Sequence, residues 1–233
     1  MTRTKKIIKK KLKKPDEFIT FSERAFHFIT RYAKSIAIGG GIVLALLLFV
    51  FLFQKWDEKS EANAYQMFRV AVEAYRAVGS PYREGSQQEY KTVLEKFDEV
   101  ITKFPRTSSG KIAMLYEGNI YLRLGAFENA IKAYEGFLRK VGKRKLYRSF
   151  AMNGLGYSYE GKKEYEKAAN AYREVIDLGE NFQLAEAYLG RARCYEKLGK
   201  TKEAVENYKD FIKGSKKSEM TNIVLRKISV LEK

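Results

Sequence analysis

One run of eighteen residues, Ile36 to Phe53, constrains this chain more than any other part of its sequence. It reads IAIGGGIVLALLLFVFLF and contains no charged side chain. As an α-helix it would be ~27 Å long, close to the ~30 Å of hydrocarbon in a bilayer. A core helix of a water-soluble protein would carry a polar stripe, and this run has none. The run therefore predicts a transmembrane helix, which we assign to residues 36–55.

The charges on either side of this run predict its orientation. Residues 1–35 contain 11 Lys and Arg against three acids, whereas residues 54–73 contain three basic and four acidic residues. Because cationic segments are retained in the cytoplasm during insertion, we expect the N-terminus inside and the C-terminal part outside. Trp56 and Tyr32 would then lie at the outer and inner membrane interfaces. No cleavage site of small residues follows, so we interpret the run as an uncleaved anchor rather than a signal peptide.

The remaining composition agrees with a two-part protein and fits a bacterial envelope protein. The net charge is +17, and the part after the run is long enough for one sizeable folded unit. The single cysteine, Cys194, excludes an internal disulfide, so a periplasmic C-terminal domain must rely on packing alone. We expect Cys194 to be a small core residue. The sole histidine, His27, has no neighbouring cysteine, and no metal site is expected there.

Residues 1–35 form a basic head that we expect in the cytoplasm. Its Lys-rich start should be attracted to anionic membrane lipids. From Thr20 the sequence predicts a short amphipathic helix, because Thr20 and Glu23 have capping-box spacing and an apolar stripe follows. Its simplest role is anchoring, with docking on a membrane partner as the alternative. Nucleic-acid binding is not expected, since the topology already explains the charge.

Three consecutive glycines, Gly39, Gly40 and Gly41, lie inside the apolar run. Small residues allow transmembrane helices to approach closely, so the cluster is a candidate contact face for a partner helix. Glycine is also common in such spans without any contact role. The sequence favours neither interpretation.

An internal repeat organises the C-terminal part. Residues 111–138, 149–176 and 185–212 align, with spacings of 38 and 36 residues. In each segment a small residue precedes a tyrosine by three positions, and a second small residue precedes another tyrosine by four. These positions are Gly118, Tyr121, Ala130, Tyr134, Gly156, Tyr159, Ala168, Tyr172, Ala192, Tyr195, Ala204 and Tyr208. Small side chains let paired helices cross closely, so each segment should be a helical hairpin packed by its tyrosines. Gly125, Gly161 and Gly199 should end the first helices.

This pattern resembles the tetratricopeptide repeat, whose hairpins stack into a solenoid. The expected fold is all-α, with an N-terminal transmembrane helix followed by a tetratricopeptide-type solenoid. We expect a degenerate first repeat and loop at residues 56–110, three repeats at 111–217 and a capping helix at 218–233. In the first repeat, Phe97 stands in for the second tyrosine and Val93 for the small residue. In the capping helix, Ile223, Leu225, Ile228 and Leu231 should partly face inward.

The segment 139–148, RKVGKRKLYR, has six cations in ten residues. The simplest interpretation is a solvated loop between repeats. As a functional feature it would be a patch for anionic lipid or for an acidic protein surface.

The sequence carries no catalytic motif, and we expect neither an enzyme nor a cofactor or metal site. Binding is the expected activity, on the groove lined by the first helix of each repeat. The groove candidates are Leu115, Asn119, Leu122, Arg123, Asn153, Tyr157, Leu189, Arg193 and Lys197. Only Asn119 matches the set with which some tetratricopeptide proteins clamp a C-terminal carboxylate. The mixed groove instead suits extended or partly folded polypeptides.

The whole chain resembles the ancillary SecYEG translocon subunit family of bacterial inner-membrane proteins. The shared features are a basic head (LKKPDEFITFSERAF), one early span and a repeat body. The resemblance implies a tethered adaptor that assists protein export or hands chains to chaperones, with the export channel, a chaperone or nascent exported chains as partners. Two alternatives remain: an envelope scaffold for cell division or outer-membrane assembly, and an adaptor of a secretion or pilus machine. The span glycines and the apolar repeat edges also permit a homodimer.

Overall fold

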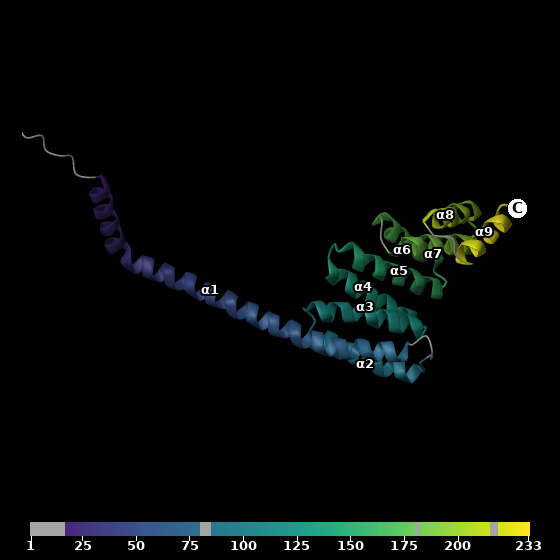
Figure 1. Ribbon diagram of the computed structural model, residues 1–233, viewed down its shortest axis with the longest axis horizontal. Coiled ribbons are helices and arrows are strands. Elements are labelled where there is room, and N and C mark those ends of the chain that lie inside the picture. Colours follow the sequence, from purple (N-terminus) through teal and green to yellow (C-terminus); the bar gives the residue numbers. More distant parts are fainter. Residues whose placement is uncertain (1–16, 80–84, 180–181, 215–218) are drawn as a thin grey trace, which may run out of the picture. The chain divides into compact units, whose positions relative to one another are not determined.

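The computed structural model describes residues 17–79, 85–179, 182–214 and 219–233. Within these ranges the chain is helical and has no β-strand, which confirms the all-α class (Figure 1). The Lys-rich start of the head lies outside the described residues. The helices are α1 (Glu17–Val78), α2 (Gln87–Lys103), α3 (Ser108–Arg123), α4 (Phe127–Val141), α5 (Lys145–Gly161), α6 (Tyr165–Asp177), α7 (Leu184–Lys197), α8 (Thr201–Gly214) and α9 (Glu219–Leu231).

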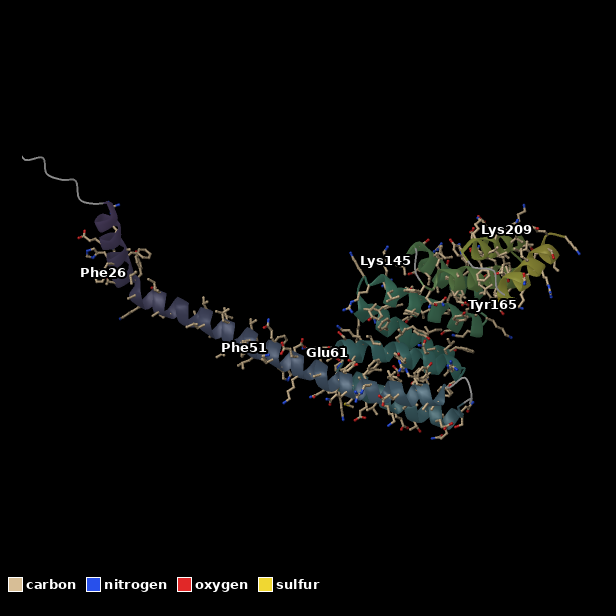
Figure 2. All side chains as sticks on the ribbon, viewed as in Figure 1. Phe26, Phe51, Glu61, Lys145, Tyr165 and Lys209 are labelled. Atoms are coloured by element: carbon tan, nitrogen blue, oxygen red, sulfur yellow. The ribbon has the colours of Figure 1, made fainter. Side chains whose placement is uncertain are left out.

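The chain divides into two units, Met1–Trp56 and Asp57–Lys233, and α1 contributes residues to both. In the first unit, the most apolar window of α1 has none of its residues buried. Phe51, for example, is 54% exposed and projects from the helix (Figure 2). Of the helices in the described ranges, only α1 is long and apolar enough to cross a membrane. So large an apolar surface needs a non-aqueous environment or a partner, and the membrane span remains a prediction.

The start of α1 differs from the prediction. The helix begins at Glu17, so Thr20 lies inside it and the expected capping box at Thr20 is wrong. The amphipathic segment and the apolar run are also parts of one continuous helix. Beside the three span glycines the space is open, and their contact role stays a prediction.

In the second unit, each helix from α2 to α9 packs against the next one along the chain. The buried side chains form three clusters, one at each end of the stack and a large one across its centre. This arrangement is a helical-hairpin solenoid. Cys194 is fully buried in the central cluster, as predicted. Burial raises the pKa of its thiol to about 12, so the reactive thiolate is scarce at neutral pH.

The second tyrosine of each repeat fills the space between two first helices. Tyr134 is fully buried, and a Cβ atom added at Gly118, in its own repeat, would lie 2.6 Å from its ring. A Cβ atom at Gly154, in the following repeat, would lie 2.3 Å from the same ring. Tyr172 is held in the same way between Gly156 and Gly190. Each ring therefore packs one hairpin internally and joins it to the next.

The turns inside the hairpins depend on a residue with positive φ. Gly125 and Gly199 have φ values of 71° and 70°, as expected for glycines that end helices. In the middle repeat, Gly161 is still helical, and Lys163 takes the left-handed position with a φ of 61°. The helix therefore ends at Gly161, as predicted, although the glycine itself does not take the left-handed conformation. The ring of Phe127 lies where its Cβ would be, at 2.3 Å.

Replacing Lys163 by glycine should stabilise the protein by roughly 0.5–1 kcal/mol, because glycine relieves the left-handed strain. Urea unfolding followed by circular dichroism measures the change. Lys163→Ala is the matched control, since it removes the side chain and keeps the strain. Equal effects of the two substitutions would show that backbone strain at this turn is not the cause.

The first repeat replaces the tyrosine–glycine pair by aromatic stacking. Phe97 is fully buried, and its ring stacks on Tyr116 with the centroids 5.1 Å apart. Tyr116 occupies the register at which the later repeats have Gly154 and Gly190. Phe68 and Tyr75 of α1 meet the same pair edge-on. Val93 is buried at the position that is small in the other repeats. This hairpin is therefore held together by stacked and edge-on rings.

The capping helix α9 faces the stack with a different side than predicted. Val224 and Ile228 are buried and Leu231 is half-buried, whereas Ile223 and Leu225 are each 49% exposed. The expectation for Ile223 and Leu225 is therefore wrong. The residues that pack on α8, Val224, Ile228 and Leu231, have the spacing of one helix face.

Candidate protein-binding face

The first helices of successive hairpins form the inner face of the solenoid. α3 contacts α5 and α5 contacts α7, whereas α4, α6 and α8 make no contact with one another within the described ranges. A stack whose first helices lie closer together than its second helices curves toward the first helices. The concave face is thus lined by α3, α5 and α7, which supplied the predicted groove residues.

The nine predicted groove residues differ in exposure. Leu115, Asn153 and Leu189 are buried; Asn119, Leu122, Tyr157 and Arg193 are half-buried; Arg123 and Lys197 are exposed. Leu115 and Leu189 belong to hydrophobic clusters, so they hold the face together. Arg123 and Lys197 present charged groups to solvent. Polypeptide binding by the set remains a prediction.

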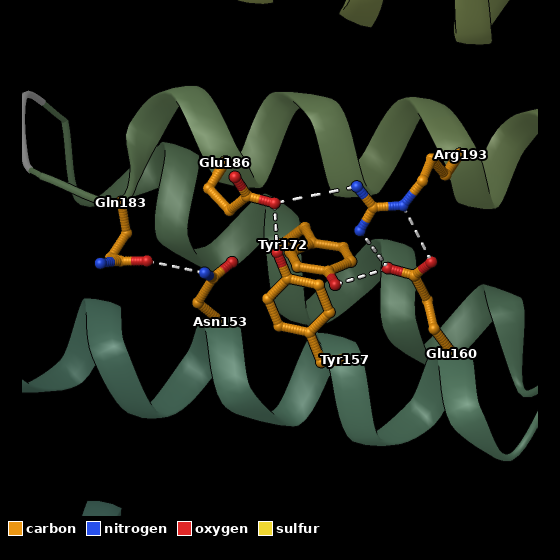
Figure 3. A network of polar contacts seen from close by, with 7 residues as sticks. All are labelled: Asn153, Tyr157, Glu160, Tyr172, Gln183, Glu186 and Arg193. Atoms are coloured by element: carbon orange, nitrogen blue, oxygen red, sulfur yellow. Dashed lines mark hydrogen bonds and ion pairs between the residues drawn. The ribbon is translucent and has the colours of Figure 1, made fainter. Parts of the chain in front are cut away.

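Arg193 lies in a polar network that sequence reasoning did not identify (Figure 3). Its guanidinium donates to both carboxylate oxygens of Glu160, with Nε–Oε2 and Nη2–Oε1 distances of 3.2 and 2.8 Å. The hydroxyl of the buried Tyr172 donates to the same carboxylate at 2.6 Å. Burial and the neighbouring Glu160 charge raise the pKa of Tyr172, which therefore stays protonated. The network connects α5, α6 and α7 and thus joins two repeats.

Tyr157 and Glu186 extend this network toward the start of α7. The Tyr157 hydroxyl donates to Glu186, and the Arg193 guanidinium lies 5.5 Å from the centroid of the Tyr157 ring. Arg193 Nη1 also approaches Glu186 at 3.8 Å. Burial, followed by the bond to Glu186, raises the pKa of Tyr157. Two predicted groove residues, Tyr157 and Arg193, are therefore occupied by contacts within the protein.

The same arrangement recurs one repeat later. The Tyr208 hydroxyl donates to Glu196 at 2.7 Å, and Lys227 Nζ of α9 donates to the Glu196 oxygens at 2.8 and 3.1 Å. Glu160 and Glu196 each lie four positions after the small residue of a first helix. This shared position in the repeat is the sequence signal that could have identified the two glutamates as equivalent. The repeat at residues 111–138 has Leu122 there, and its Tyr134 donates instead to Asn119 Oδ1 at 2.7 Å.

The Glu196 contacts predict a pH dependence of stability. Burial alone would raise the pKa of this carboxyl, but the hydrogen bonds from Lys227 and Tyr208 outweigh it and lower the pKa below 4.5. The bonds therefore stabilise the fold above pH 4.5, and this contribution is lost as the pH falls through the lowered pKa. Since the pair is partly exposed, we expect less than about 1 kcal/mol.

The measurement is urea unfolding of the protein and of Lys227→Met between neutral and acidic pH. The stability difference between the two proteins should shrink below pH 4.5. A difference that stays constant across this range would contradict a role for Glu196 ionisation.

Asn153 is buried and incompletely paired. Its Nδ2 donates to Gln183 Oε1 at 2.7 Å, whereas its Oδ1 has no partner among the described residues. An unpaired buried acceptor is unfavourable by ~1–3 kcal/mol.

An open pocket of about 310 Å³ lies between α7 and α9 at the C-terminal end of the inner face. Glu196, Ile223, Arg226, Lys227, Val230 and Leu231 line it. Val230 is 67% exposed, so the pocket wall offers apolar surface beside two cations. No cluster of His, Cys, Asp and Glu that could hold a metal ion occurs in the described part of the chain.

The fold and this face define a class of protein: a helical-repeat protein of the kind that binds other proteins. The model of the tetratricopeptide repeat family matches residues 84–145 and 153–218, more than half of the chain, and the chain belongs to this family. Tetratricopeptide proteins bind other proteins through their repeats, which makes this chain a protein-interaction adaptor. None of the curated proteins matches the sequence.

Solved structures show the same fold at low sequence identity. MamA from Desulfovibrio magneticus RS-1, from residue 41 to its end, is 16% identical with a TM-score of 0.52, over 67% of this chain and 76% of that chain. A tetratricopeptide repeat protein from Parabacteroides merdae is 18% identical with a TM-score of 0.57, over 72% and 60%. A putative kinesin light chain from Podosopora anserina is 14% identical with a TM-score of 0.56, over 73% and 86%.

Proposed function

We propose that this protein is a membrane-tethered adaptor whose repeats bind polypeptides on their concave face. The observation that carries the proposal is the pocket between α7 and α9, where Ile223 and Val230 lie beside Arg226 and Lys227. Such a mixed surface suits an extended or partly folded segment, because it receives apolar side chains and carbonyl or carboxylate oxygens together.

Site-specific photo-crosslinking in cells tests the face. The crosslinking residue replaces Lys197 or Val230 on the inner side, and Lys132 or Arg173 on the second helices serves as the matched exposed control. We expect polypeptide adducts from the inner positions and few from the controls. Equal adducts from both sides, or none from the inner side of a correctly inserted protein, would refute the assignment.

We further propose that α1 spans the bacterial inner membrane once, with the head in the cytoplasm and the repeats in the periplasm. The charge difference across residues 36–55 and the unburied apolar window support this orientation. The test uses single introduced cysteines, because the native Cys194 is buried. Ser229→Cys should react with a membrane-impermeant maleimide in cells with a permeable outer membrane, whereas Thr2→Cys should not. The reverse pattern would invert the topology.

The partner we propose is a polypeptide in protein export, which the adaptor would assist or hand to a chaperone at the export channel. The tether supports this role, since it fixes the repeats near the membrane surface and raises their effective concentration there. Copurification in mild detergent discriminates the alternatives. Export-channel subunits or chaperones would support the proposal. Division, outer-membrane assembly, secretion or pilus components would replace it with the corresponding scaffold or adaptor role.

A further inference from the structure

The proposed function leaves the basic segment between α4 and α5 unexplained. Residues 139–148 contain six cations and no acid. Arg148 approaches Glu174 at 4.0 Å, and Arg144 lies over the Tyr147 ring. The other four cations, at positions 139, 140, 143 and 145, are exposed and form no ion pair with any residue in the described ranges. The like charges repel one another, which is unfavourable unless an anionic surface compensates them.

The segment lies at one edge of the solenoid. Helix direction alternates along the stack, so α3, α5 and α7 begin at the same edge. We call residues 104–108, 139–146 and 182–184 at this edge the basic edge. Lys145 lies on the same side of the repeats as Glu61, and Tyr165 lies on the opposite side (Figure 2).

The basic edge is also where the chain enters the repeats from its apolar run. Glu61 follows Trp56 by only a few residues in α1. Its carboxylate accepts hydrogen bonds from the N–H groups of Ser108 and Ser109, at 2.8 and 3.2 Å, at the start of α3. This edge of the second unit therefore begins within a few residues of the proposed span.

Two large apolar side chains are exposed at the same edge. Phe182, just before α7, is 86% exposed, and Leu146, in the first turn of α5, is 44% exposed. Isolated apolar residues between cations are typical of surfaces that enter the lipid interface, where the rings and alkyl groups reach the acyl boundary.

We propose that the basic edge docks on the anionic phospholipid headgroups of the membrane in which α1 is anchored. The proposal rests on the membrane anchor of the proposed function. The tether holds the edge near the lipid surface, the unpaired cations are attracted to it, and Leu146 and Phe182 enter the interface.

The test uses the full chain, reconstituted into vesicles of phosphatidylcholine alone or mixed with phosphatidylglycerol. A fluorophore on Asp177→Cys reports from the end of α6 at the basic edge, and one on Thr201→Cys reports from the opposite edge. Lipids with a spin label on the headgroup quench a nearby fluorophore. We expect quenching at position 177 with anionic vesicles, little with neutral ones, and little at position 201 with either.

Charge variants separate this surface from general cationic attraction. K143Q/R144Q/K145Q removes three cations at the basic edge, and K163Q/K200Q/K202Q removes three exposed cations at the opposite edge. Each cation near an anionic surface strengthens the binding equilibrium about fivefold. The first variant should therefore lower the ratio of docked to undocked protein roughly 100-fold. The second should leave it unchanged. Raising the salt from about 0.1 to about 1 M should release the docked protein without any substitution, because the Debye length falls from ~10 to ~3 Å.

The outcomes distinguish the two proposals. Flotation of the vesicles on a density gradient shows whether the chain is anchored in them. If the chain floats with both kinds of vesicle, but quenching at position 177 does not depend on anionic lipid, the docking proposal is overturned and the membrane anchor is not. The same result would leave an acidic protein as the partner of the edge. A chain that floats with neither kind of vesicle would overturn the membrane anchor, and lipid docking with it.

Discussion

Gly154→Ala is expected to destabilise the solenoid by about 3 kcal/mol, although it adds only one methyl group. The new Cβ would lie 2.3 Å from the ring of Tyr134. That ring is fully buried and already packed against Gly118 on its other side, so it has no space into which to move. The strain would fall on the junction between two repeats. Urea unfolding of the full chain in detergent, followed by circular dichroism, measures the loss.

Gly214→Ala is the matched control. It is the same chemical change at the last residue of α8, and no atom of the described residues lies within 4 Å of the Cβ position. Both substitutions restrict the unfolded chain equally, and the control should therefore stabilise the protein by up to ~1 kcal/mol. In a Tyr134→Ala background the cost of Gly154→Ala should largely disappear. If Gly154→Ala were as harmless as the control, the packing of Tyr134 between two repeats would be wrong.

The sequence predicts the hairpins well because their determinants are local. A small residue followed by a tyrosine recurs within each segment, and the turn glycines Gly125 and Gly199 lie where the helices end. The burial of Cys194 agrees with the small apolar character of a lone cysteine. These features require no knowledge of how one hairpin meets the next.

The contacts between repeats are less predictable, because they depend on the curvature of the stack. Gly154 and Gly190 receive the tyrosine of the preceding repeat, a contact that no spacing within one hairpin indicates. Arg193 looks like a ligand-binding residue when only its helix face is considered. Its partner Glu160 lies in another repeat, and only the stacked structure brings the two together. Ile223 and Val224 are adjacent apolar residues, and only the packing of α9 decides that Val224 is buried and Ile223 exposed.

Arg193→Met should destabilise the protein by roughly 2–3 kcal/mol. The Glu160 side chain is only 19% exposed, and the substitution would leave its carboxylate with the Tyr172 hydroxyl but without its cation. Loss of one partner of a buried ion pair typically costs ~3–5 kcal/mol, and the 30% exposure of Arg193 reduces that value. Methionine keeps most of the side-chain volume, so the change isolates the charge and its hydrogen bonds.

Arg69→Met provides the comparison. Its contact with Glu73 lies at 3.8 Å with both side chains about two-thirds exposed, and such pairs contribute less than ~0.5 kcal/mol. Adding Glu160→Gln to Arg193→Met should cost less than the sum of the two single changes, since each removes the same interaction. Photo-crosslinking from Lys197 should persist in Arg193→Met at a temperature where the variant stays folded, if Arg193 joins the repeats and does not bind the polypeptide. Loss of the crosslink from a folded Arg193→Met protein would instead assign Arg193 to the binding face.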